Sequence, residues 1–129
     1  MAYTHNIVGW FEIPVADMER AIKFYESVLQ IELTRAQMGP LDMAWFPWFE
    51  NTTGSGGSLV HHPEHYKPSA DGILIYLTTP TGDLNKDLEN IKKAGGKIIE
   101  PRRKISDDHG YMAIFIDSEG NRVALHSRT

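Results

Sequence analysis

The sequence predicts an α+β fold in which two βαβββ units form one domain over residues 1–129. The order of strand, helix and three further strands occurs twice, and aligning Asp17 with Asp83 superimposes the two patterns. A polar segment rich in proline, residues 62–71, separates the units. We therefore place the units at about 6–62 and 72–126. The linker is too short for two independent domains, so the units must share a core.

Each unit contains one predicted amphipathic helix. Apolar residues recur at helical spacing over about 17–30 in the first unit and 83–94 in the second. Asp17 and Asp83 stand where a short carboxylate can accept from the free N–H groups of the first turn, so both are predicted N-caps. Two glycines at 95–96 end the second helix, since glycine readily adopts the positive φ of a helix exit.

Strands are expected before and after each helix. The segments that precede the helices, about 6–15 and 72–79, are rich in β-branched and aromatic residues. Six shorter segments of the same character follow the helices, separated by turn residues. These six strands are expected at residues 31–38, 43–49, 57–62, 97–105, 111–117 and 122–126.

Composition excludes several classes of partner. The chain has a formal net charge of −4 and no basic stripe, so we expect no nucleic-acid partner. No apolar run approaches the roughly 20 residues of a membrane helix, and the N-terminus lacks the charged and apolar regions of a signal peptide. Cysteine is absent, which excludes disulfides and thiolate zinc sites. These features predict a cytoplasmic protein without a membrane partner.

Two motifs carry a resemblance to a known superfamily. The stretch FEIPVADMERAIKFYESVL at 11–29 and the close FIDSEGNRVALH at 115–126 resemble the opening and the final hairpin of the vicinal-oxygen-chelate superfamily, which includes glyoxalases, bleomycin resistance proteins and dioxygenases. The most similar branch is that of predicted enzymes related to lactoylglutathione lyase. Ser118 replaces the usual proline of the hairpin. The resemblance implies a cupped, mixed sheet of eight strands, with helices on its outer face and a ligand inside.

The resemblance also implies where a metal would bind, because metal-using relatives take ligands from the first and last strands of each unit. When the motifs are matched, the first-strand positions fall on Trp10 and Tyr76, or on Leu74 in place of Tyr76 if the loop carries an insertion. The last-strand positions fall on Leu59 and Ala124. None of these side chains is an ordinary ligand of a divalent cation. We therefore expect no metal and no other cofactor, and we predict that Trp10, Tyr76, Leu59 and Ala124 contact a small-molecule substrate.

Glu12 is the candidate catalytic residue. Strand alternation directs Phe11 and Ile13 toward the helices and leaves Trp10 and Glu12 facing the cup. A carboxylate in that position should be partly desolvated, which would raise its pKa toward a value suited to a general base. The alternative is a structural role, in which Glu12 accepts hydrogen bonds from neighbouring strands or pairs with Arg122.

Two histidines complete the predicted substrate-binding set. His61 and His126 share strand parity with Leu59 and Ala124 and lie at corresponding places in the repeat. Together with Glu12 they would form a shifted divalent-metal site, since two histidines and a carboxylate are a common ligand set. Alternatively, both histidines lie at strand ends in solvent.

Two functions follow from these residues. The first is a binding module that holds an aromatic or cationic small molecule against aromatic walls, which suits the acidic charge. The second is a lyase, isomerase or dioxygenase-type enzyme acting on a small oxygenated metabolite, with Glu12 as the base or with the shifted metal site. The resemblance further implies a homodimer.

Overall fold

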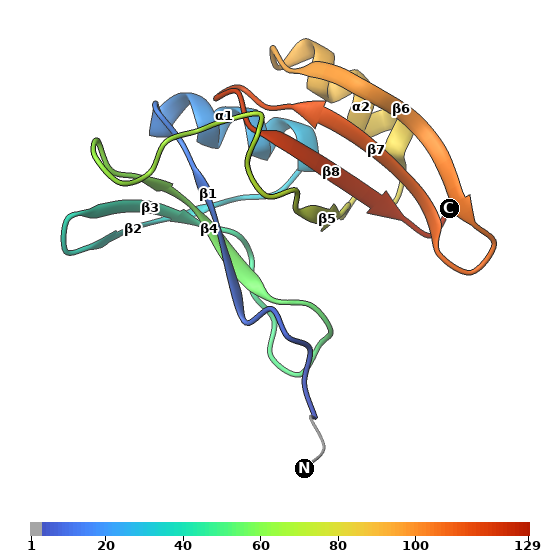
Figure 1. Cartoon of the computed structure of the whole chain (residues 1–129), viewed down its shortest axis with the longest axis horizontal. Helices are drawn as coiled ribbons and strands as arrows, with labels where there is room; N and C mark the ends of the chain where they lie inside the picture. The colour runs from blue at the N-terminus through green and yellow to red at the C-terminus, as the bar shows by residue number, and fades with distance from the viewer. Residues whose placement is uncertain (1–3) are drawn as a thin grey trace.

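The structure is a computed structural model, and it describes residues 4–129. Its elements follow the predicted order, strand, helix and three strands, twice over (Figure 1). The first module comprises β1 (Trp10–Pro14), α1 (Met18–Leu29), β2 (Thr34–Met38), β3 (Leu41–Trp45) and β4 (Gly56–His61). The second module comprises β5 (Tyr76–Thr78), α2 (Leu84–Lys93), β6 (Lys97–Ser106), β7 (Gly110–Ile116) and β8 (Arg122–Ser127). The predicted α+β class with two βαβββ modules is confirmed.

Among residues 4–129, hydrogen bonds join eight strands into two four-stranded mixed sheets, so the single eight-stranded sheet that the resemblance implies is not formed. The strand order is β1-β4-β3-β2 in module 1 and β5-β8-β7-β6 in module 2. In both sheets the first strand runs parallel to the last, and the remaining pairs are antiparallel. The two modules therefore share one topology, as the repeated pattern predicts.

Both helices begin at the predicted residues. The side chain of Asp17 accepts from the N–H of Arg20 at 3.1 Å, and that of Asp83 accepts from the N–H of Lys86 at 3.2 Å. Gly95 follows α2 with a φ of +94°, a conformation that costs glycine little. Local sequence signals thus define the bounds of both helices.

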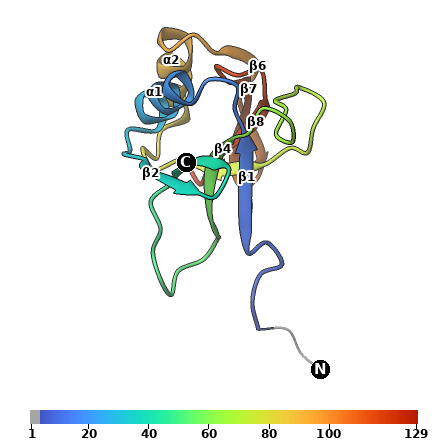
Figure 2. The ribbon, with the colours of Figure 1, turned by 90° about the vertical axis from the view of Figure 1, so that its left-hand side faces the viewer.

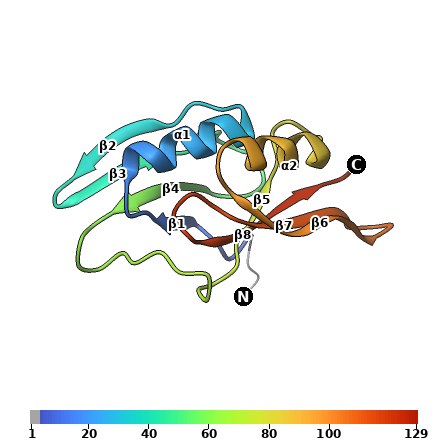
Figure 3. The same ribbon diagram turned by 90° about the horizontal axis from the view of Figure 1, so that it is seen from above.

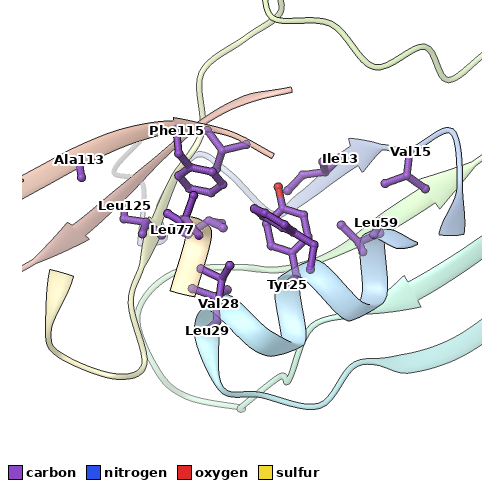
Figure 4. Packing of buried hydrophobic residues seen from close by; sticks show 14 of the residues in the cluster. Ile13, Val15, Tyr25, Val28, Leu29, Leu59, Leu77, Ala113, Phe115 and Leu125 are labelled. Atoms are coloured by element: carbon purple, nitrogen blue, oxygen red, sulfur yellow. The ribbon is translucent and has the colours of Figure 1, made fainter. Parts of the chain in front are cut away.

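The core lies between the helices and one face of each sheet. Figure 3 shows α1 and α2 on the same side of the strands. Ile13 and Leu59, which are neighbours in the β1–β4 register, point toward α1, where they pack in the same cluster as Tyr25 (Figure 4). We call the other face of each sheet, which is turned away from the helices, its open face.

The hairpin between β7 and β8 ties module 2 to module 1. The buried Tyr25 hydroxyl, from α1, donates to Oδ2 of Asp117 at 2.6 Å. The side-chain amide of Asn121 donates to the carbonyl of Pro14 at the end of β1, at 2.8 Å. Oδ1 of Asp117 accepts from the backbone N–H groups of Glu119 and Asn121. The Asp-Ser-Glu-Gly-Asn motif is therefore a joint between the modules.

Glu119 completes this joint at the N-terminus of α1. Its carboxylate accepts from the backbone N–H groups of Ala16 and Asp17 at 2.9 and 2.8 Å, and from the guanidinium of Arg20 at 2.7 and 3.0 Å. Burial alone would raise the pKa of Glu119, but Arg20 and the N–H donors outweigh it and lower that pKa to about 2. A carboxylate of module 2 thereby satisfies helix-terminal donors of module 1.

Two segments extend away from the sheets. Residues 4–9, before β1, and the loop between β3 and β4 project to the same side of the molecule (Figure 2). Both expose large apolar side chains, since Ile7 is 80% and Phe49 71% accessible. Within residues 4–129, neither helix is long and apolar enough to cross a membrane.

Candidate functional site

The open face of module 1 carries all three tryptophans of the chain. Trp10 is on β1, Trp45 ends β3, and Trp48 follows in the projecting loop. The rings of Trp10 and Trp45 meet edge to face, with centroids 5.8 Å apart and planes at 78°. All three indoles are more than one-third exposed. We call Trp10, Trp45 and Trp48 the indole floor.

Gly56, the first residue of β4, makes room for the indole floor. The register pairs Gly56 with Trp10, so its missing side chain would point to the open face. A Cβ added at Gly56 would lie 2.6 Å from Cδ1 of Trp48 and 3.2 Å from Cζ3 of Trp10. A side chain here would displace Trp48, so glycine is what allows the indoles to converge.

Glu12 lies on the open face beside Trp10, as strand alternation predicts. Its Oε1 accepts from the hydroxyl of Tyr66 at 2.7 Å, and its Oε2 accepts from Nε1 of Trp10 at 3.3 Å. The hydrogen bond to this carboxylate raises the pKa of the Tyr66 hydroxyl. The expected desolvation of Glu12 is wrong, because Glu12 is exposed. Tyr66 belongs to the linker, where no local pattern signals that it reaches β1.

The predicted orientation of Leu59 is wrong, because Leu59 points into the core and not to the open face. In the parallel register Glu12 pairs with Ser58, so the Ser58 side chain is on the open face. Ile13 pairs with Leu59, which is fully buried in the core. His61 lies two residues after Leu59 in β4 and therefore points to the same face as Leu59. Its Nδ1 donates to the carbonyl of Val15 at 3.0 Å. Leu59 and His61 therefore do not line the open face. The Ser58 hydroxyl is buried and has no hydrogen-bond partner among the described residues.

On module 2, the predicted residues lie on the open face. Tyr76 pairs with Ala124, and Thr78 pairs with His126, in the parallel β5–β8 register. Tyr76 is half exposed, whereas Ala124 is fully buried. His126 pairs with Thr78, which is two residues after Tyr76 in β5. Ser58 pairs with Glu12, which is two residues after Trp10 in β1. Ser58 is therefore the equivalent of His126 in module 1. The predicted equivalence of His61 and His126 is therefore wrong.

The residues at the implied metal positions do not fit a divalent cation. The register pairs Trp10 with Gly56 and Tyr76 with Ala124, so these positions hold an indole, a glycine, a phenol and a methyl group. The shifted set is not assembled either, since His61 donates to Val15, and His126 donates from Nε2 to the carbonyl of His109. Among residues 4–129, no three His, Cys, Asp or Glu side chains are grouped to hold an ion.

A cavity of about 500 Å³ lies in the seam between the modules, and Trp10 is the residue that it shares with the indole floor. Trp10 and Glu12 line its module 1 side, and Ile75 and Arg122 line its module 2 side. Lys67 of the linker also borders it. The predominantly apolar lining with few charged groups is typical of a small-molecule site.

Comparisons with known proteins agree with this architecture. The family model described as Glyoxalase/Bleomycin resistance protein/Dioxygenase superfamily matches residues 7–125. A glyoxylase/bleomycin resistance protein/dioxygenase domain from Frankia sp. EAN1pec is 16% identical, with 96% of this chain and 98% of that chain covered and a TM-score of 0.71. The fosfomycin resistance protein FosX from Listeria monocytogenes is 15% identical, with 98% and 94% covered and a TM-score of 0.65.

Glyoxalase I from Zea mays is 21% identical, with a TM-score of 0.64. The match covers 92% of this chain but only 45% of the maize chain, so this chain spans less than half of that relative. At such identities these structures show a shared fold alone. No curated protein sequence matches the chain significantly.

Proposed function

Because the chain belongs to the Glyoxalase/Bleomycin resistance protein/Dioxygenase superfamily, we propose that it binds an aromatic or cationic small molecule on the indole floor, without the metal of its metal-using relatives. The observation that carries this proposal is the convergence of Trp10, Trp45 and Trp48 around Gly56 on an exposed face. Large exposed aromatic surfaces are costly in water, and their concentration in one place marks a binding surface.

Beside the indoles themselves the Glu12 carboxylate favours a cation over an anion, whereas Lys67 and Arg122 line the adjoining cavity. The negative face of an indole attracts an ammonium group, and tryptophan does so more strongly than other aromatic residues. Glu12 places a carboxylate directly beside Trp10. The chain also has a net charge of −4, which raises the local concentration of cations. We therefore favour an aromatic ligand that carries a quaternary or protonated amine.

Phenyltrimethylammonium is the probe, with phenol as its uncharged counterpart. We expect the cation to quench or shift tryptophan emission, and this signal reports on the indole floor alone because the chain has no other tryptophan. Trp10→Leu should weaken binding about fivefold through the lost cation–π contact. Glu12→Gln should weaken it about threefold, the size of an exposed ion pair.

Glu64→Gln is the matched control, since it removes an exposed carboxylate of the linker and should leave binding unchanged. Equal affinity for phenol and the cation in both wild type and Glu12→Gln would contradict the charge argument. No emission change at millimolar probe would contradict the site itself.

A catalytic role for Glu12 is the alternative function. The specific observation in its favour is an exposed carboxylate on the open face that is held by Tyr66 and Trp10. A general base must then exchange one of these donors for the proton of a substrate. Product formation that is lost in Glu12→Gln and kept in Glu64→Gln would favour the enzyme over the binding module.

We further propose that two copies of the chain pair, with the projecting segments covered by the second copy. An apolar hollow of about 740 Å³ lies between these segments and β5, and Phe11, Phe46 and Phe49 are among its lining residues. Phe49→Ser should shift the molar mass measured by light scattering from dimer toward monomer, because it removes a large exposed apolar contact. A wild-type mass of one chain at 100 μM (on the order of a weak dimer's Kd) would refute the pairing.

A further inference from the structure

Module 2 has a cavity of its own, distinct from the indole floor. It opens on the open face near the β6–β7 hairpin and has a volume of about 350 Å³. Its walls combine two arginines, Arg103 and Arg128, with two histidines, His109 and His126. Tyr76 and Met112 supply an aromatic and a thioether surface. Within residues 4–129 no carboxylate lines this cavity, whereas Glu12 lies beside the indole floor of module 1.

Strand register explains why these side chains converge. Arg103 on β6 pairs with Met112 on β7, and Met112 pairs with His126 on β8. Residues opposite one another in a sheet share a face, so the three side chains form one row across the open face. The guanidinium of Arg103 also lies 3.6 Å from Sδ of Met112. The row therefore places a cation next to an apolar wall.

The hairpin and the C-terminal end of β8 orient the remaining groups. His126 donates from Nε2 to the carbonyl of His109 at 2.6 Å. Arg128 donates to the carbonyl of Asp108, so a backbone oxygen holds this guanidinium without neutralising it. Among the described residues Arg128 forms no ion pair, and Arg103 pairs only with Glu100, at 3.2 Å with both side chains partly exposed. An exposed pair of this kind offsets little of the positive charge.

We propose that this cavity binds a small organic anion, with a carboxylate or phosphate between Arg103 and Arg128 and an apolar body against Tyr76 and Met112. Guanidinium groups are the preferred partners of both anions, because their planar donors form charge-assisted and often bidentate hydrogen bonds. The volume suits one ring with one charged group. The site is separate from the proposed indole floor and does not depend on it.

The test is a titration followed by NMR of 13C-methyl-labelled methionine, which places a probe at Met112 inside the cavity. Phenyl phosphate, benzoate and inorganic phosphate are the anionic probes, and phenol is the uncharged control. We expect the two aromatic anions to shift the Met112 signal at lower concentration than phenol, by at least about fivefold. Comparison of benzoate with phenyl phosphate identifies which anion is preferred. Inorganic phosphate tests whether the apolar body is needed.

Adjacent arginines on one strand provide a matched pair of variants. Arg103→Gln removes a charge that lines the cavity, whereas Arg102→Gln removes one that lies over the ring of Tyr111, 3.9 Å from its centroid. We expect phenyl phosphate to bind Arg103→Gln about fivefold to tenfold more weakly and Arg102→Gln nearly as well as wild type. Thermal unfolding of both variants checks that they are folded.

Three outcomes would overturn the proposal. Equal weakening in Arg102→Gln and Arg103→Gln would mean unspecific charge attraction. Equal affinity for phenol and benzoate would mean an apolar patch. Shifts confined to methionines other than Met112 would place the anion elsewhere. Quenching of tryptophan emission by phenyltrimethylammonium reports separately on module 1, so this proposal and the proposed function can fail independently.

Discussion

Replacement of Asp117 with alanine is expected to lower the free energy of unfolding by about 3–4 kcal/mol. The carboxylate is buried and accepts four hydrogen bonds, from the hydroxyl of Tyr25, the side-chain amide of Asn121 and the backbone N–H groups of Glu119 and Asn121. Removal leaves several buried donors without acceptors, each at a cost of about 1 kcal/mol or more. Because Tyr25 is in α1, the loss also loosens one module from the other.

Chemical denaturation of wild type and Asp117→Ala measures this loss. Asp108→Ala is the control, since Asp108 is an exposed aspartate of a turn, and its effect should stay within about 0.5 kcal/mol. Tyr25→Phe removes only the hydroxyl donor and leaves the other three hydrogen bonds of Asp117 in place. Its free energy of unfolding should therefore fall less than that of Asp117→Ala. In the double variant the two losses should not add, because they share one hydrogen bond. A loss under about 1 kcal/mol for Asp117→Ala would show that the buried Asp117 carboxylate does not stabilise the joint between the modules.

Glu119→Gln is expected to destabilise the protein by about 2 kcal/mol at neutral pH, and this difference should vanish in acid. The pKa of Glu119 is about 2 in the folded protein, against an ordinary value of 4.5. The folded state therefore favours the ionised form. This stabilisation is fully present above pH 4.5 and is lost as the pH falls through 2. The expected loss of about 2 kcal/mol is smaller than the full pKa shift of Glu119 implies, because Arg20 is half exposed and solvent screens its charge.

The measurement is the free energy of unfolding of wild type and variant from pH 7 to pH 2. The two curves should stay parallel above about pH 5 and then converge as the wild-type carboxylate is protonated. Glu89→Gln, an exposed carboxylate on α2, should reproduce the wild-type curve. A constant difference down to pH 2 would mean that the introduced amide is disfavoured for its shape and hydrogen-bonding pattern, and not for its missing charge.

The modules and helices are predictable from the sequence because the features that define them are local. Asp17 and Asp83 cap helices through N–H groups three residues away, and the pattern of apolar residues that defines each helix face is equally local. The parity of β1 is also local, because alternation from the buried Ile13 leaves Trp10 and Glu12 on the other face. Such features need no knowledge of partners distant in sequence.

The errors at the site arise from pairing between strands. Leu59 and His61 were expected on the open face, yet whether β4 presents Leu59 or Ser58 there depends on its register against β1. A difference of one residue moves every side chain to the opposite face. Tyr66 was missed for a related reason, because its partner Glu12 is distant in sequence and is brought close only by the folded linker.

The sequence by itself determined the α+β class, the duplication, both helices with their caps, and the placement of Trp10, Glu12 and Tyr76 on one side of their strands. These follow from periodicity and capping, which act over a few residues. Only the tertiary structure decided that Trp45 and Trp48 join Trp10 over Gly56, and that Arg103 meets Met112 and His126 in a second cavity. Both groupings depend on strand register and loop course, and these are set by contacts between residues far apart in the chain.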